Sequence, residues 1–236
     1  MPTIVVVAGP SGSGKTVLSS KLKNEHDFAE LVSVTTRDRR EGEINGIHYT
    51  FLDEEQFHRL DEKKGLIEKV NYNGKYYGVP AAEAEKAALL GKPSVVVTEP
   101  IGVKNVEKYC KENNWNIIKV FVNNPVDILI ERMQSRLKEE TGHLNLNNEE
   151  DVAIFNKKKA THESRLNNML TFEQANWVKP MLEGKDKYDI QLDYFDASNT
   201  EETINKIKKM VENVMEDTHI IGVAEDIKKL AKKNNF

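Results

Sequence analysis

The chain has only one cysteine, Cys110, so no disulfide can form within it. A chain with so little cysteine suits a reducing compartment, and we expect a cytoplasmic location. No apolar run approaches the roughly 20 residues that a membrane-spanning helix needs. The first residues lead directly into a strand pattern and do not resemble a signal peptide. These absences argue against a disulfide-stabilised secreted domain and predict that the chain has no membrane partner.

Basic charge is also scarce, because 34 Lys and Arg residues are outnumbered by 38 Asp and Glu residues. A net charge of −4 predicts no general attraction to nucleic acid. Apolar residues make up 39% and charged residues 31%, which favours a compact core with a large solvated helical surface. The six histidines lack metal-ligand spacing. A length of 236 residues fits one α/β domain with an inserted lid, as a monomer or a homodimer.

One stretch, residues 3–16, carries a strong chemical signal. An apolar run, Ile4 to Ala8, leads into a glycine-rich segment that fits the pattern G-x-x-x-x-G-K-[ST] in full. The run predicts a buried parallel strand, and the residues after Thr16 predict a helix. In that context the loop N–H groups and the helix N-terminus bind phosphate. The alternative is a glycine-rich turn that binds nothing.

This motif predicts a nucleoside triphosphate site, with Lys15 at the β- and γ-phosphates and Thr16 as the Mg²⁺ ligand. The motif by itself does not identify the acceptor of a phosphate. The candidate ATP-binding residues are Gly9, Ser11, Gly12, Ser13, Gly14, Lys15 and Thr16.

The rest of the chain alternates strand and helix patterns, which predicts an α/β fold. Glu99 follows an apolar strand, at the edge where open α/β sheets place ligands. Asn124 and Pro125 predict a helix cap. Strands are expected at 3–8, 30–35, 94–98, 116–122 and 189–195, and helices at 14–24, 53–64, 80–90, 102–113, 126–137, 200–214 and 224–233.

Three segments depart from this alternation. Turn signals at Asn45-Gly46 and Asn73-Gly74 predict hairpins over 43–51 and 66–79, which would form a small antiparallel unit that holds a second ligand. The loop 36–43 contains three arginines within four positions, and it is either a charged surface loop or a phosphate-binding loop. The polar segment 138–185 predicts a helical insertion, which either contributes to a site or only packs.

The order of these motifs resembles the guanylate kinase family, closely over about residues 3–137 and loosely over 165–214. The resemblance implies a three-layer P-loop kinase core with a parallel sheet, formed by 1–32, 80–137 and 186–216. It also implies a small antiparallel nucleoside-monophosphate (NMP)-binding subdomain at 33–79, an extended helical lid at 138–185 and a C-terminal extension at 217–236. The motifs that carry it are Ser33-Val34-Thr35-Thr36-Arg37, Arg40, Gly42-Glu43, Gly46, Tyr49-x-Phe51, Glu68 and Gly74-x-Tyr76-Tyr77-Gly78.

The activity that this resemblance implies is transfer of the ATP γ-phosphoryl group, with Mg²⁺, to GMP, dGMP or a related purine monophosphate. Arginine forks and hydroxyl groups suit the phosphate dianion, and a carboxylate suits the N–H donors of a guanine edge. By resemblance, the substrate-binding residues are Ser33, Arg37, Arg40, Glu43, Tyr49, Glu68, Tyr77, Val79 and Glu99. The implied catalytic residues are Lys15, Arg37, Arg132, Arg136 and Arg165.

The sequence departs from the family pattern at several positions. Val79 stands where a Ser or Thr hydroxyl would face guanine O6, Val97 replaces an Asp that supports Mg²⁺, and Ile101 replaces a Gln. Loss of a donor to O6 weakens discrimination against other bases, so the acceptor is hypothesised to be a deoxy- or modified purine monophosphate. Two other hypotheses remain, a P-loop kinase for another small acceptor and a non-catalytic protein-binding module. The retained Lys15 argues against the module.

Overall fold

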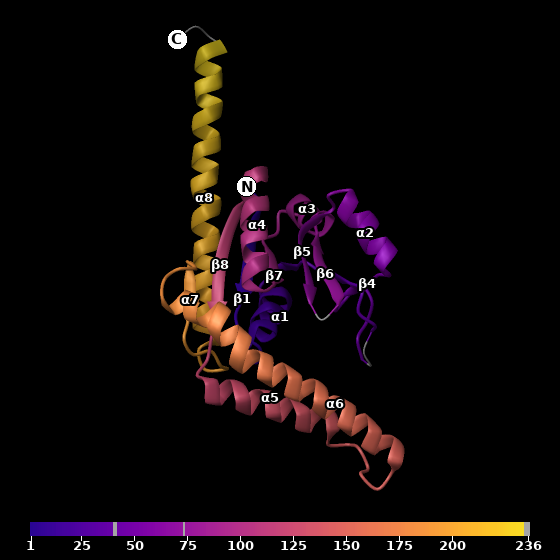
Figure 1. Cartoon of the computed structure of the whole chain (residues 1–236). Helices are drawn as coiled ribbons and strands as arrows, with labels where there is room; N and C mark the ends of the chain where they lie inside the picture. The colour runs from indigo at the N-terminus through magenta and orange to yellow at the C-terminus, as the bar shows by residue number, and fades with distance from the viewer. Residues whose placement is uncertain (40–41, 73, 234–236) are drawn as a thin grey trace.

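The computed structural model describes residues 1–39, 42–72 and 74–233, with only the backbone for Tyr72 and for residues 217–233. The chain forms two β-sheets with helices around them, and the strands of the second sheet are inserted between β2 and β7 of the central sheet (Figure 1). The strands are β1 (Thr3–Ala8), β2 (Ala29–Glu30), β3 (Val34–Thr35), β4 (Thr50–Phe51), β5 (Leu66–Tyr72), β6 (Lys75–Pro80), β7 (Ser94–Val97), β8 (Asn116–Val122) and β9 (Ile190–Leu192). The helices are α1 (Lys15–Glu25), α2 (Glu54–Glu62), α3 (Ala81–Leu89), α4 (Pro100–Asn113), α5 (Val126–Thr141), α6 (Glu149–Asn168), the π-helix η1 (Met169–Val178), α7 (Lys179–Leu182) and α8 (Thr200–Lys233).

The central sheet has the strand order β2-β7-β1-β8-β9, and its neighbouring strands are all parallel. Because side chains alternate along a strand, β1 contributes to two separate cores. Ile4 and Val6 belong to the core on one face of the sheet, whereas Val5 and Val7 belong to the core on the other. A strand buried on both faces reads as the unbroken apolar run seen in the sequence.

Helices cover both faces, so the molecule has the predicted three layers. On one face α4 packs through Val103 and Val106. On the other face α1 contributes Leu18, and α8 contributes Ile204 and Ile207. The predicted fold class, α/β with a parallel sheet, is confirmed by this arrangement.

The second sheet, ordered β4-β3-β6-β5, is mixed, not purely antiparallel. The hairpin predicted over 66–79 is present as β5 and β6, whose strands pair antiparallel. The hairpin predicted over 43–51 is wrong, because β4 instead pairs parallel with β3. The Asn45 side chain accepts a hydrogen bond from the Phe51 backbone N–H at 2.8 Å, which closes this loop without a strand ladder.

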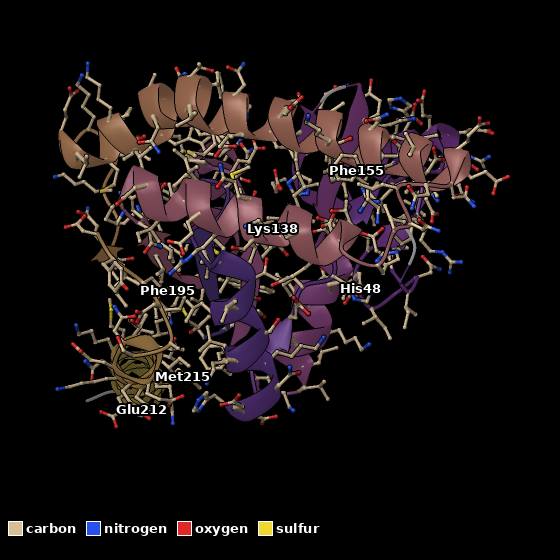
Figure 2. All side chains as sticks on the ribbon, turned by 90° about the horizontal axis from the view of Figure 1, so that it is seen from below. His48, Lys138, Phe155, Phe195, Glu212 and Met215 are labelled. Atoms are coloured by element: carbon tan, nitrogen blue, oxygen red, sulfur yellow. The ribbon has the colours of Figure 1, made fainter. Side chains whose placement is uncertain are left out.

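Helix α6 lies alongside α5, as Figure 2 shows with Lys138 on α5 and Phe155 on α6. Asn148 is the N-cap of α6, and its side chain accepts a hydrogen bond from the Glu150 backbone N–H at 2.8 Å. It continues directly into the π-helix η1, which spans ten residues. A π-helix of this length is rare, since most are single turns.

The C-terminal helix α8 runs from Thr200 to Lys233 as a single element. The sequence predicts two separate helices, 200–214 and 224–233. This prediction of a break is wrong, because α8 continues without interruption from one to the other. The first part packs on the central sheet, and the second extends well beyond it (Figure 1). None of the helices in the described residues is both long enough and apolar enough to cross a membrane.

Candidate active site

The loop between β1 and α1 adopts backbone conformations that only glycine tolerates easily. Gly9, Gly12 and Gly14 have φ values of +146°, +83° and +101°. A Cβ on Gly9 would lie 2.0 Å from the Val122 carbonyl oxygen, and one on Gly14 would lie 2.7 Å from the Phe195 ring. The motif glycines are therefore required by packing as well as by the turn.

Asn124, which follows β8, and Arg132 on α5 hold this loop through its carbonyl groups. The Asn124 Nδ2 donates to the Ser13 carbonyl oxygen at 3.0 Å, and its Oδ1 accepts from the Phe195 backbone N–H at 3.0 Å. Of the predicted cap at Asn124 and Pro125, the structure makes Pro125 the N-cap of α5, whereas the Asn124 side chain supports the loop. Arg132 donates to the carbonyl oxygens of Gly12 and Ser13, each at 3.4 Å, and to that of Phe195 at 2.7 Å.

Lys15 lies among charges of both signs at the front of the loop. Its Nζ donates to the Pro10 carbonyl oxygen at 2.8 Å. Burial lowers the pKa of Lys15 to about 8. The Glu173 and Glu99 carboxylates act in the opposite direction and raise this pKa, whereas the charge of Arg165 lowers it further. The fold therefore brings Arg165, predicted from a distant segment, within electrostatic range of the P-loop lysine.

Glu173 on η1 is a site residue that the sequence analysis missed. Its side chain accepts from the Ser11 backbone N–H at 2.6 Å and from the Ser11 hydroxyl at 3.0 Å. The residue is only 3% exposed. No motif surrounds this glutamate in a polar helical segment, so only its position in the fold reveals it.

Next to the second sheet, just after β3, Arg37 and its neighbours form a cluster suited to an anion. The Arg37 guanidinium makes two hydrogen bonds to Glu43, at 2.7 and 2.8 Å, and its Cζ lies 5.2 Å from the centre of the Tyr49 ring. The hydrogen bond to Glu43 is the main cause of a raised pKa of Arg37. Tyr49 also contacts Tyr77, with the ring centres 6.0 Å apart. The predicted phosphate ligand Arg40 lies outside the described residues.

Glu68 on β5 is a buried carboxylate with one unpaired oxygen. Its Oε1 accepts from the Thr98 hydroxyl at 2.9 Å, while Oε2 is buried without a hydrogen-bond partner among the described residues. Burial raises the pKa of Glu68 to about 7, and the charge of Glu99 adds to this rise. Val79 is the partner of Glu68 in the β5–β6 register, so the two side chains share one face of the second sheet.

Glu99 connects the two halves of the site. It is the N-cap of α4, next to the carboxyl end of β7 in the central sheet. Burial and the charge of Glu173 raise its pKa. Its charge acts on both Lys15 and Glu68. The sequence placed Glu99 at this edge, but it did not identify Thr98, which ties Glu68 to the same strand end. Ser33 lies immediately before β3, which pairs with β6 in the second sheet.

An open pocket of about 520 Å³ lies beside the P-loop, between α5 and the segment after β9. Arg132, Arg136, Tyr194 and Asp196 are among the residues that line it. Arg136 is held by Glu140 through a hydrogen bond of 2.9 Å from its Nε. Because Arg132 also contacts the loop carbonyls, the pocket and the P-loop share one wall.

Comparisons with known proteins agree with this geometry. The family model described as guanylate kinase matches residues 1–163. A guanylate kinase from Prochlorococcus marinus is 34% identical over 166 residues, covering 65% of this chain and 88% of the relative. One from Synechococcus is 35% identical over 164 residues, covering 64% and 84%.

A similar fold is found in the crystal structure of guanylate kinase from Anaplasma phagocytophilum. That structure has a TM-score of 0.58 and 23% identity, and the match covers 90% of this chain and 85% of the other. The family model matches well over half of the residues, and the P-loop and acceptor-side motifs lie within the matched range. This chain therefore belongs to the guanylate kinase family.

Proposed function

We propose that this protein catalyses transfer of the γ-phosphoryl group of ATP to GMP, giving ADP and GDP. The observation that carries the proposal is the position of Glu99. Its charge acts both on Lys15 in the P-loop and on Glu68 in the second sheet. A phosphoryl donor and a purine acceptor bound at these two places would therefore meet at one edge of the central sheet.

The donor side is assigned to the P-loop and the adjoining pocket. The loop N–H groups and Lys15 would hold the phosphates, and the pocket that Arg132 and Tyr194 line would hold the adenosine. The Thr16 side chain is exposed next to Lys15, and its hydroxyl suits a cation that prefers oxygen ligands. Thr16 would hold Mg²⁺ together with phosphate oxygens and water, and the ion would supply positive charge at the phosphates.

The acceptor side is assigned to the second sheet. Arg37 and the hydroxyls of Tyr49 and Tyr77 would bind the phosphate of GMP, with Glu43 fixing the Arg37 fork. Arg40 remains a predicted ligand of the same phosphate.

The guanine base is assigned to the carboxylates near β7. Glu68 Oε2, which has no hydrogen-bond partner in the part of the chain that the structure describes, would accept from guanine N–H groups, while Thr98 holds the other oxygen. Glu99 and Ser33 are the further base contacts that we propose.

Transfer itself requires positioning and positive charge, since little covalent chemistry falls to the protein. Lys15 lies in the P-loop motif, and Arg165 acts electrostatically on it, so both would supply positive charge near the donor phosphates. Arg136 lines the adjoining pocket. Movement of the lid, residues 138–185, would bring its single arginine, Arg165, over the phosphates and exclude water.

The domain assignment follows from these roles. We propose a core of 1–32, 80–137 and 186–216, an NMP-binding unit of 33–79, the lid and an extension of 217–236. We place the reaction in the cytoplasm, because the single cysteine suits a reducing compartment.

An acceptor panel tests the proposal. Purified protein with ATP and Mg²⁺ is assayed with GMP, dGMP, AMP and the 2-aminoadenine deoxynucleotide, the last because Val79 offers no hydroxyl to O6. We expect GMP to have the highest kcat/KM. Absence of ADP formation with every acceptor would refute a kinase function, and preference for the 2-aminoadenine nucleotide would refute GMP as the acceptor.

Replacement of the P-loop lysine separates catalysis from simple binding. Lys15→Met should lower kcat by about 10³-fold, because it removes a cation from the transferred phosphoryl group. Lys21→Met, on the outer surface of the same helix and paired with Glu201, is the matched control. A Lys15→Met variant with unchanged kcat would contradict the assigned role.

A further inference from the structure

Glu173 occupies a place in the P-loop where a phosphate oxygen is expected. Its two carboxylate oxygens bind the N–H and the hydroxyl of Ser11, the third residue of the motif, at 2.6 and 3.0 Å. The glycine-rich loop is an anion site, because its N–H groups and the start of α1 carry partial positive charge. The bound anion in this structure is a side chain of the protein itself.

The π-helix gives Glu173 its orientation. With i→i+5 spacing, residues five apart lie on one face, and Asn168 accordingly donates from Nδ2 to Glu173 Oε1 at 3.1 Å. In a continuous α-helix, Glu173 would be rotated by about 80° from Arg165, eight residues earlier. The π segment changes this phase, and both side chains act on Lys15.

The charges around Glu173 favour an exchangeable anion. The carboxylate is almost fully buried, and a buried carboxylate is stable only with such hydrogen bonds. It lies within electrostatic range of Lys15, the residue that a terminal phosphate would contact, and of the second carboxylate, Glu99. A triphosphate at Lys15 would add negative charge beside the Glu173 and Glu99 carboxylates. Repulsion between these anions would favour the departure of a carboxylate from the site.

We propose that Glu173 holds the place of the donor's terminal phosphate in the nucleotide-free enzyme and is displaced by that phosphate. Glu173 then acts as a positioning residue that couples the lid to the donor site. While its carboxylate binds Ser11, η1 is tied to the P-loop. Arrival of the terminal phosphate frees η1 from Ser11, so that the segment with Arg165 can move over the phosphates. The inference rests on the proposed donor site, since it requires ATP to bind at the P-loop.

The discriminating measurement compares two nucleotides that differ only in the terminal phosphate. Titration calorimetry gives the Kd of ATP and of ADP, each with Mg²⁺, for the full chain and for Glu173→Gln. The amide keeps the shape but not the charge, so the variant should bind ATP about tenfold more tightly and ADP with less than a twofold change. Glu163→Gln, an exposed position on α6, is the matched control and should change neither Kd.

The outcomes separate this inference from the proposed function. Equal changes for ATP and ADP, or weaker ATP binding by Glu173→Gln, would overturn the displacement and leave a structural role. If the unmodified protein bound neither nucleotide, the proposed function would fall, and the inference with it.

A second measurement does not depend on that variant. Trp177 lies on η1 four residues from Glu173 and contacts the Phe172 ring, with centres 6.0 Å apart. In a Trp115→Phe background Trp177 is the sole tryptophan. A non-hydrolysable ATP analogue should shift its emission, and ADP should not. The same response to both nucleotides, or to neither, would overturn the proposal.

Discussion

At the scale of single residues, the carboxylates of this site differ in how well their negative charge is stabilised, because their partners differ. Glu43 faces the Arg37 guanidinium, which stabilises its charge. Glu68 has a neutral partner, the Thr98 hydroxyl, in a buried setting, and its pKa rises to about 7. A carboxylate in this state is poised to gain or lose a proton near neutral pH.

This pKa predicts a pH-dependent affinity for the acceptor. The ionised Glu68 accepts guanine N–H groups, so the Kd of GMP should fall as pH rises from 6 to 8, by about tenfold per unit below pH 7. Glu68→Gln should bind GMP more weakly and lose this dependence, while it retains the titration of the GMP phosphate. Calorimetric titrations at several pH values check this, and parallel curves for the two proteins would count against it.

The same residue affects stability in the opposite direction. The folded-state pKa lies above the ordinary glutamate value of 4.5, so the folded protein holds a proton that the unfolded chain releases. Stability should therefore fall as pH rises from about 4.5 to about 7, by about 3 kcal/mol from this group. Urea unfolding at pH 5 and pH 8 measures the change, which Glu68→Gln should remove. A fall of equal size in the variant would assign it to other groups.

At the scale of elements, side chains on and beside the segment between β3 and β4 fix the position of Arg37. Arg37 is fixed by Glu43 and by the rings of Tyr49 and Phe51, at 5.2 and 5.5 Å from their centres. These contacts restrict the guanidinium before any phosphate binds, which lowers the entropic cost of binding.

Loss of the Glu43 charge should loosen this arginine. Glu43→Gln is expected to raise the KM for GMP by roughly tenfold with less than a threefold change in kcat, since the contact acts in ground state and transition state alike. Steady-state kinetics with ATP and GMP provide the measurement. Glu54→Gln, at the exposed start of α2, serves as the control. A loss confined to kcat would show that Glu43 acts on transfer itself.

At the scale of the whole molecule, α8 combines two parts with different roles. Ile204, Ile207 and Val211 pack into the core beneath the central sheet, whereas the end of the helix projects away from it (Figure 1). The candidate site residues come from the part of the chain that precedes α8, most of them between β1 and η1. The packed part should therefore determine stability, and the projecting part should have little effect on catalysis.

Truncation and substitution test this division. Removal of residues 217–236 should leave kcat and KM within twofold, because Ile204, Ile207 and Val211, which anchor α8 in the core, all remain. Ile207→Ala should lower the free energy of unfolding by about 2–5 kcal/mol, because Ile207 is fully buried. Steady-state kinetics of the truncated protein check the first prediction, and urea denaturation of Ile207→Ala checks the second. A truncated protein without activity would place a functional contact in the removed segment.

Most elements of the central sheet were predictable because local pattern and final structure agree. Apolar β-branched runs such as Ile4–Ala8 are buried on both faces, and the glycine pattern specifies the loop that follows. The hairpin over 43–51 and the break in α8 were not predictable, since turn propensity and polar composition are weak local signals that tertiary contacts override. The Asn45 side chain and the β3–β4 pairing decided the first case.

For the candidate site, the sequence by itself determined which residues have the right chemistry. Short contiguous motifs could be identified from the sequence alone. They include the P-loop pattern, the arginines of 36–43 and the carboxylates Glu68 and Glu99. Only the tertiary structure decided the partners: Thr98 beside Glu68, Asn124 behind the P-loop and Glu173 on Ser11. These pairs join residues 30, 111 and 162 positions apart. Burial and hydrogen bonding across such separations depend on the packing of whole elements, which no local pattern encodes.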